Sequence, residues 1–578
     1  MKTRLPLLLL LLLLAACDGG RTPGGAAVWD PCGRGDAYRV LAGSAREERC
    51  HVLTRWFGLD SAAVAAPPPE ILSDTRDAVL VSTPSHLQVE LGQGSDRMLR
   101  AAVRRLPEGE AGARPAAAGP ELVAEVFWRR GAAVLSLARV SLPEPGAPRD
   151  NPWRELAAAL PDGPGALDLV TRWADPAGSA RSGPQVAWGA PRVTRAAARQ
   201  RPPDVLLLSV DALRADALAA APRLHALLRR GALWPRAVSP SNWTLPSYAS
   251  LFTAMDADRH GAGRGPLPEH AAGAALPRDY RGIRPGLPTL AAAFRAAGYA
   301  TAMVHQNPFL EPWSGLDRGF ERYVRSADDG ATGVRVASEW WNSEPHRPRF
   351  LVLHLMGPHL PYAPPPGAAL PPDPLQALDW RAFLAADHAP EQRRAFFRLD
   401  EPQQAAVRAR YHAEVAAVDA AVAPWLEELL SSATPPVLAF HSDHGEELWD
   451  EGSFEHGHSF TDAVVRIPIG LVWPGHVAPR VHEHLAGAVD LGPSLLRLAR
   501  VPAPAGWEGD LFAPRAAVRS LQPLYRAEHG GRVFALAPER AQWLPFDPRA
   551  GADGPPAVLD EALQRALAEL GYAEAAPR

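Results

Sequence analysis

The amino-acid sequence predicts an α/β domain with a mostly parallel sheet flanked by helices, preceded by an N-terminal β-rich, sandwich-like domain. From Asp204 onward, apolar runs of strand length alternate with helical patterns, which is typical of a parallel sheet covered on both faces. Residues 28–195 instead hold short apolar runs separated by Pro and Gly, which favours a β-sandwich. The 578 residues, 47% of them hydrophobic, are enough for both cores and argue against global disorder.

The first 27 residues have the pattern of an export signal followed by a tether. Two basic residues precede a leucine-rich run that is too short to span a membrane. The next residues, Leu14-Ala15-Ala16-Cys17, resemble the lipobox of bacterial lipoproteins, in which the cysteine is lipidated. We therefore predict a lipoprotein signal peptide over residues 1–17, a Gly-rich tether over 18–27, and a lipid-anchored membrane protein of the cell envelope facing the periplasm or the exterior. An ordinary signal peptide with an incidental cysteine is the alternative.

The composition excludes some functions. The 60 basic and 64 acidic residues nearly balance, so we expect no nucleic-acid partner. Lys2 is the only lysine and lies in the predicted signal peptide, so the mature protein has no catalytic lysine. Apart from Cys17, the only cysteines are Cys32 and Cys50, and in an exported protein these most simply form a disulfide.

The expected strands and helices can be placed along both parts of the chain. In the N-terminal part, apolar runs predict strands at 78–81, 122–128, 133–140, 167–173 and 186–188. In the second part, strands are expected at 205–210, 300–304, 350–355 and 437–440, and helices at 222–230, 288–298 and 401–433.

Polar side chains gather where the predicted strands end, namely Asp211, Thr244, His359, Asp443 and His444. Open α/β sheets bind their ligands at this edge. Pro246 suits the first turn of a helix, so the preceding hydroxyl is expected at a helix N-terminus, where anions bind favourably. Two carboxylates, an imidazole and a hydroxyl can hold one divalent cation, which would make the hydroxyl more acidic. The pattern therefore predicts a metal-assisted ester-cleaving site.

Six segments of the second part together resemble a known family. The segments are V-L-L-L-S-V-D-A-L-R-A-D, W-T-L-P-S-Y-A-S-L-F-T, H-L-M-G-P-H-L-P-Y, S-D-H-G-E-E-L, H-G-H-S and R-I-P-I. In this order they are similar to the sulfatase-like branch of the alkaline phosphatase superfamily, over residues 202–515. The resemblance implies a central sheet, a small C-terminal subdomain (516–578) and one essential divalent metal ion, whether Mn, Zn, Ca or Mg.

The resemblance also implies roles for single residues. Asp211, Asp443 and His444 take the positions of metal ligands, and Thr244 takes the position of the nucleophile, which also contacts the metal. His359 resembles the histidine that contacts the substrate or protonates the leaving group. By a looser alignment, His458 lies near a second cationic contact.

This sequence departs from authentic sulfatases at the nucleophile. Those enzymes carry Cys or Ser in C/S-x-P-x-R, which is oxidised to formylglycine, whereas this chain has Thr244-Leu245-Pro246-Ser247-Tyr248. Threonine is not a known source of that aldehyde, and the arginine is missing. A threonine nucleophile resembles instead the superfamily's phosphodiesterases and its phosphoglycerol- and phosphoethanolamine-transferring enzymes.

Together these observations predict a metal-dependent hydrolase or transferase that acts through Thr244 on an anionic phosphate or sulfate ester, carried for example on a glycan or a lipid. Two alternatives stay open. One is a sulfatase that works without formylglycine. The other is a non-catalytic, ligand-binding lipoprotein with the same fold.

Overall fold

A computed structural model describes residues 27–53, 71–106, 121–142, 153–175, 183–195, 201–264, 280–521, 532–536, 541–545 and 561–570, with short gaps at 35, 43, 366, 385–387 and 389. The predicted signal peptide and almost all of the predicted tether lie outside the described residues. No helix among the described residues is both long and apolar enough to cross a membrane.

The second part of the chain is built on five adjacent parallel strands. In sheet order these are β19 (Val437–Ser442), β12 (Val205–Val210), β18 (Arg349–Leu355), β16 (Ala300–His305) and β17 (Arg322–Ser326). β22 (Arg466–Val472) and β13 (Ala232–Val238) extend the sheet beyond β19 through antiparallel pairings. The expected α/β fold is thus confirmed.

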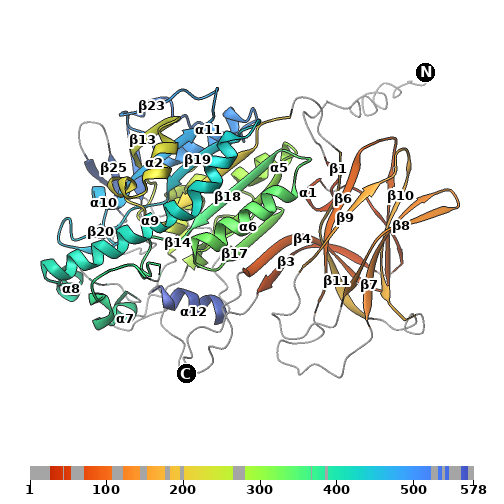
Figure 1. Cartoon of the computed structure of the whole chain (residues 1–578), viewed down its shortest axis with the longest axis horizontal. Coiled ribbons are helices and arrows are strands. Elements are labelled where there is room, and N and C mark those ends of the chain that lie inside the picture. Colours follow the sequence, from red (N-terminus) through yellow and green to blue (C-terminus); the bar gives the residue numbers. More distant parts are fainter. Residues whose placement is uncertain are drawn as a thin grey trace, which may run out of the picture.

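Helices cover both faces of this sheet because its strands are apolar on both sides (Figure 1). Along β12, Leu206 and Leu208 belong to one core, whereas Val205 and Leu207 belong to the other. The first core is closed by α2 (Pro222–Leu228), α6 (Gly330–Ser343) and α9 (Glu401–Ser431). The second core is closed by α3 (Thr244–Thr253), α5 (Leu290–Ala296) and α11 (Leu491–Leu498).

The N-terminal part is a β-sandwich, as predicted. One layer has the order β4 (Ile71–Thr83), β11 (Gly183–Arg195), β6 (Arg97–Arg105) and β9 (Arg154–Leu160), with β1 (Ala27–Trp29) on β11 and β3 (Ala45–Leu53) on β4. The other has the order β2 (Arg39–Ala42), β5 (Ser85–Leu91), β10 (Gly165–Trp173), β7 (Leu122–Arg130) and β8 (Ala133–Leu142). Alternate residues such as Val79, Val81, Leu167 and Leu169 fill the core between the layers.

Among the described residues, the two parts share one continuous sheet of 14 strands. β4 pairs antiparallel with β17, with Val324 opposite Asp74, so the first sandwich layer continues the central sheet (Figure 1). The sequence reasoning expected two successive domains and did not anticipate this pairing. Beyond residue 515, β24 (Val518–Leu521), β25 (Arg532–Leu536) and β26 (Ala541–Pro545) form a small antiparallel sheet, followed by α12 (Glu561–Glu569).

The expected disulfide is not present, because Cys32 is a free cysteine in the structure. Its side chain is half-buried and packs against the sandwich core beside Tyr38 and Ala45. Burial and the neighbouring carboxylate of Asp77 raise the pKa of the Cys32 thiol well above its usual range. Cys50 lies on β3, and its side chain is outside the described residues.

Candidate active site

Strand register brings the two predicted carboxylates together. β12 and β19 are parallel neighbours with Val210 opposite Ser442, so the residues that follow, Asp211 and Asp443, leave the sheet side by side. Both side chains are fully buried. With His444 they form a group whose potential ligand atoms all lie within 4.8 Å of one another.

The orientation of His444 follows from a single hydrogen bond. Its Nδ1 lies 2.9 Å from the carbonyl oxygen of Gly445, and since a carbonyl only accepts, Nδ1 carries the proton. The other ring nitrogen, Nε2, faces the carboxylates, 3.4 Å from Asp211 Oδ1 and 3.5 Å from Asp443 Oδ2. Its lone pair is therefore free to coordinate a cation.

The donor set fits a divalent metal ion. Asp211 Oδ1 and Asp443 Oδ2 are buried atoms without a hydrogen-bond partner, and both face His444 Nε2. A buried carboxylate oxygen left unpaired costs free energy that a bound cation would offset. Two carboxylates and one imidazole are a mixed N/O ligand set suited to Zn²⁺ or Mn²⁺, and the neighbouring hydroxyl of Thr244 adds a fourth ligand.

The pKa values of the three proposed ligands are shifted by their burial and by one another's charges. Burial and the charge of Asp211 raise the pKa of Asp443 to about 6. Burial opposes the ionisation of Asp211 too, but the His359, His354 and His444 rings hold its pKa below its usual range. Burial lowers the pKa of His444, yet the two carboxylates raise it above its usual value.

Thr244 is the first residue of α3, as the position of Pro246 predicts. Its side chain is buried, and its Oγ1 lies 3.4 Å from His444 Nε2. The hydroxyl therefore stands at a helix N-terminus, where developing negative charge is favoured, and next to the carboxylate cluster.

Asn307 links the hydroxyl to the carboxylates. Its Nδ2 donates to Asp211 Oδ2 at 2.8 Å and to Thr244 Oγ1 at 3.2 Å. Its Oδ1 accepts from the backbone N–H of Phe309 at 2.8 Å, which caps a short 3₁₀ helix and fixes the amide. Asn307 thus connects the Thr244 hydroxyl with Asp211 and also fixes the loop after β16.

His354 also orients Asp211, and the sequence reasoning did not single it out. Its Nδ1 accepts from the backbone N–H of Gln306 at 3.4 Å, so its Nε2 carries the proton and donates to Asp211 Oδ2 at 3.1 Å. One feature of the sequence could have identified His354. A histidine among the apolar residues of strand β18 needs a buried polar partner.

His359 lies near this cluster, together with a second histidine. Its ring centroid is 6.5 Å from that of His444 and 4.9 Å from that of His456, and the tilted rings of His456 and His444 have centroids 4.2 Å apart. The Nδ1 of His359 donates to the carbonyl of Leu360. Burial lowers the pKa of His359, so its ring is neutral near neutral pH. A neutral ring with an unprotonated Nε2 can accept a proton.

His458 is oriented differently. Its Nε2 lies 3.1 Å from Glu447 Oε2 and 2.8 Å from Ser453 Oγ, and its Nδ1 donates to the carbonyl of His456 at 3.0 Å. Burial lowers the pKa of His458, but hydrogen bonds to Glu447 and Glu455 raise it above its usual value. The structure thus pairs His458 with carboxylates and places the ring of His456, instead of His458, against His444.

The side chains of Trp243 and Tyr248 near the nucleophile make packing contacts, and Arg214 makes ion pairs. Trp243 packs edge-on against Phe309, and Tyr248 packs against the ring of His354. Arg214 fixes the loop after β12 by pairing with Asp216 at 2.7 Å and with Asp450.

Comparison with known proteins adds a family assignment. A sequence profile described as Sulfatase matches residues 203–501, just over half of the chain. An endo-4-O-sulfatase from Bacteroides thetaiotaomicron is 26% identical over 222 residues, which is 37% of this chain and 42% of that protein. The chain thus spans less than half the length of this curated relative.

Solved structures of similar proteins include two from bacteria. A putative sulfatase from Bacteroides thetaiotaomicron superposes with a TM-score of 0.47 and 18% identity, covering 61% of this chain and 88% of that one. A phosphonate monoester hydrolase from Silicibacter pomeroyi superposes with a TM-score of 0.44 and 20% identity, covering 62% of this chain and 88% of that one.

Proposed function

The chain belongs to the sulfatase family of ester hydrolases, and on this basis we propose that it cleaves or transfers a phosphate- or sulfate-type ester with Thr244 as the nucleophile. One observation carries the proposal. The Thr244 hydroxyl lies at the N-terminus of α3, 3.4 Å from His444 Nε2, beside two buried carboxylate oxygens that lack partners.

The ligands of the proposed metal ion are Asp211, Asp443 and His444, with Thr244 as a further contact. A divalent cation held by them would supply Lewis acidity, which lowers the pKa of the hydroxyl and neutralises charge on the ester oxygens. Asn307 holds the Thr244 oxygen in place by donating to it and couples its position to Asp211.

In the first step, Thr244 Oγ1 loses its proton to solvent and attacks the phosphorus or sulfur atom, and the bond to the leaving oxygen breaks. A protonated imidazole then supplies the proton that the leaving alcohol needs. His359 is the candidate, because its ring lies against the cluster, and the charge of an anionic ester would raise its pKa on binding. His458 stays a second candidate, because its hydrogen bonds to Glu447 and Glu455 raise its pKa against the effect of burial.

In the second step, water or an acceptor alcohol attacks the phosphorus or sulfur atom of the Thr244 adduct, the bond to Thr244 Oγ1 breaks, and this oxygen takes up a proton from solvent. The unprotonated Nε2 of His359 can take the proton of the attacking molecule. The same residue thereby returns to the form that it had at the start.

The choice between ester classes rests on the residue at position 244. Threonine favours phosphodiester cleavage or transfer, because it cannot replace the formylglycine that sulfatases use. The name of the matched endo-4-O-sulfatase supports the rival activity, sulfate ester hydrolysis without formylglycine. We also propose that the protein is exported and lipid-anchored through Cys17, on the basis of the N-terminal sequence pattern.

Parallel assays on an aryl sulfate, a phosphomonoester and a phosphodiester test this function, before and after treatment of the full-length protein with a chelator. We expect turnover that is fastest on the phosphodiester, is lost on chelation and returns with added divalent metal. Efficient turnover of the aryl sulfate alone would instead support the rival activity. Metal binding without turnover of any ester would indicate a binding lipoprotein.

A further inference from the structure

Asn242 links the segment before the nucleophile to a loop that carries two histidines. We call residues 455–459 the histidine loop, because two of them are histidines. The backbone oxygen of Asn242 accepts from the N–H of Gly457 at 3.0 Å, and its side-chain Nδ2 donates to the carbonyl of Ser459 at 2.9 Å. These two hydrogen bonds lie on either side of His458 in the chain, so Asn242 holds the backbone of this histidine from both ends.

The side chain of Asn242 points to the same side of the chain as that of Thr244. Trp243, between them, has an extended backbone with φ −162° and ψ 164°, and successive side chains of an extended backbone point to opposite sides. The indole of Trp243 accordingly packs into the apolar core against Phe309. Asn242 therefore reaches the histidine loop on the side where the nucleophile lies.

Packing alone does not favour an asparagine at this position. Asn242 is fully buried, and its Oδ1 has no hydrogen-bond partner. A buried amide oxygen without a partner costs free energy, and a leucine of similar shape would avoid that cost. Among the described residues, the hydrogen bond to Ser459 is the only one that this side chain makes. Its amide thus serves to hold the histidine loop.

The histidine loop borders the proposed metal ligands. The centroid of the His456 ring lies 4.2 Å from that of His444, and Nδ1 of His458 donates to the carbonyl of His456. Burial lowers the pKa of His458, but its hydrogen bonds to Glu447 and Glu455 raise it above its usual value, so this ring can carry a proton. A shift of the loop would therefore move a protonated imidazole relative to the nucleophile.

We propose that Asn242 is a positioning residue, which holds His458 where it can give its proton to the leaving oxygen of the ester. The proton moves from the imidazolium to this oxygen as the bond to phosphorus or sulfur breaks, and the imidazole is left neutral. The proposal rests on the proposed function and deepens it, because it assigns the first proton transfer to His458 and leaves the second to His359.

Two esters of the class that the protein cleaves fastest test the proposal, one that releases 4-nitrophenolate and one that releases an aliphatic alcohol. The first leaving group is a weak base and departs without a proton, whereas the second needs one. Asn242→Leu keeps the branched shape of the side chain and removes the donor. It should lower turnover of the aliphatic ester about tenfold or more beyond its effect on the nitrophenyl ester, with a melting temperature within a few degrees of wild type. Asn242→Ala, which removes the donor and adds no bulk, should give the same selective loss.

A double variant shows whether Asn242 acts through His458. On the aliphatic ester, Asn242→Leu combined with His458→Ala should stay within about threefold of His458→Ala alone, because a donor that is absent cannot be positioned. Asn342→Leu is the matched control, since Asn342 is an exposed asparagine on α6. This control should cleave both esters within about twofold of wild type.

Hydrogen exchange at residues 455–459 gives a readout that needs no turnover. Asn242→Leu should raise the exchange rate of these amides about threefold or more, whereas Asn342→Leu should leave it unchanged. The proposal is overturned if exchange is unchanged in Asn242→Leu, if both esters lose turnover equally, or if the effects of Asn242→Leu and His458→Ala multiply on the aliphatic ester. Absence of ester turnover by the wild type would instead contradict the proposed function, and exchange would still test the hold of Asn242 on the loop.

Discussion

Two carboxylate oxygens, Asp211 Oδ1 and Asp443 Oδ2, lie buried without a hydrogen-bond partner. At the scale of single residues this is the most informative feature of the site, because such atoms are rare unless something binds them. The Asp443 carboxylate accepts backbone N–H groups from Ala212 at 3.3 Å and from His444 at 3.0 Å, but only through its other oxygen. One oxygen of each aspartate is thus held ready for a ligand.

Asp443→Asn should lose bound metal and ester turnover together. The substitution keeps the shape of the side chain but removes a negative charge from the ligand set, so metal affinity should fall about 100-fold or more. Metal content of the purified variant is the measurement. Asp216→Asn is the control, since Asp216 is a largely exposed carboxylate that pairs with Arg214. If Asp443→Asn holds as much metal as this control, Asp443 is not a ligand.

Asn307→Ser isolates the two hydrogen bonds that Asn307 donates into the site. A serine can still cap the short helix by accepting from Phe309, but it is too short to reach Asp211 and Thr244. Loss of hydrogen bonds to a charged group is worth about 1.5–3 kcal/mol, so kcat should fall about 10- to 100-fold. An unchanged kcat would show that Asn307 is only a cap, whereas an altered melting temperature would reveal a role in folding.

The sequence motifs identify the metal-ligand candidates, but they do not fix the positions of all the histidines near them. The motifs identified Asp211, Asp443 and His444, which the chain brings into contact. They pointed to His458 as a further contact, whereas the ring next to His444 is that of His456. Gly457 between the two histidines has a φ of 77° and turns the chain, and no spacing rule fixes this local backbone conformation.

At the scale of elements, the strands and helices that flank the site were predicted closely. β12 spans Val205–Val210, as its apolar run predicts, and α9 ends at Ser431 against a predicted 433. Both have strong local signals, namely a fully buried aliphatic run and a long pattern that opens with a capping box at Asp400. Local periodicity was sufficient for these elements because little in the tertiary structure opposes it.

α9 also contains a buried carboxylate that makes folding pH-dependent. Burial raises the pKa of Glu414 from an ordinary value of 4.5 to about 8. The folded protein therefore holds a proton that the unfolded chain releases above about pH 4.5, so raising the pH from 4.5 to 8 lowers the free energy of unfolding. The loss is about 1.4 kcal/mol per pH unit at most.

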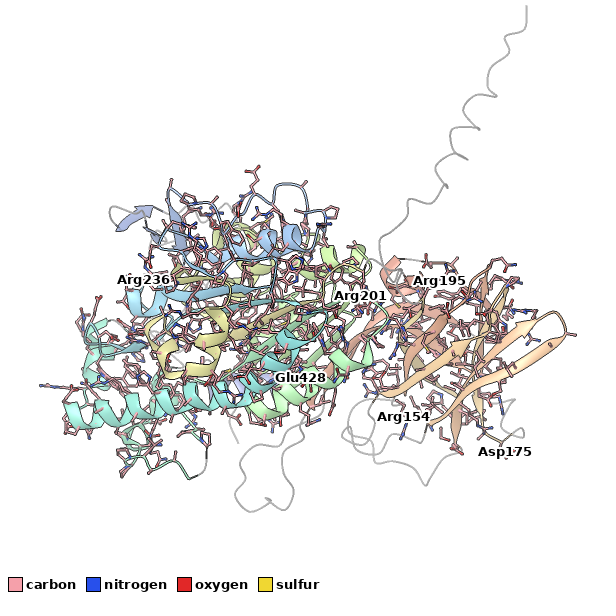
Figure 2. All side chains as sticks on the ribbon, turned by 45° about the horizontal axis from the view of Figure 1, so that its top comes forward. Arg154, Asp175, Arg195, Arg201, Arg236 and Glu428 are labelled. Carbon is pink, nitrogen blue, oxygen red and sulfur yellow. The ribbon has the colours of Figure 1, made fainter. Side chains whose placement is uncertain are left out.

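Glu414→Gln should remove this dependence while keeping the acceptor for the backbone N–H of Ala363. Relative to wild type, the variant should gain stability as the pH rises from 5 to 8, measured by urea unfolding at several pH values. Glu428→Gln is the matched control, because Glu428 is exposed on the same helix (Figure 2). If both variants follow the same pH profile, Glu414 does not hold a proton in the folded state.

At the scale of the whole molecule, the shared sheet is the feature that sequence could not predict. β4 and β17 are separated by more than 200 residues, and neither apolar run indicates its partner. The ion pair between Arg322 and Asp74 adds to this junction. Strand pairing between distant segments depends on the packing of both, so the β-sandwich was predictable whereas its continuity with the central sheet was not.

The N-terminal pattern predicts that the whole protein is held at a membrane. Cys17→Ala should move the protein from the membrane to the soluble fraction, because the acyl chains of a lipoprotein are needed for stable binding. Fractionation of cells that express the full chain is the measurement, and mass spectrometry of the mature N-terminus identifies the lipid. A variant that still sediments with membranes would show that some other feature retains it.

The central claim is that the Thr244 hydroxyl is the attacking group, and the turnover of Thr244→Ala on the fastest-cleaved ester tests it most directly. The account predicts a loss of about 1,000-fold or more with metal still bound, because a covalent route has been removed. Thr244→Ser should keep partial activity, since the attacking oxygen survives. Thr253→Ala, which removes a hydroxyl from the other end of α3, should stay within a few-fold of wild type. Near wild-type turnover by Thr244→Ala would contradict the account and assign the attack to another group.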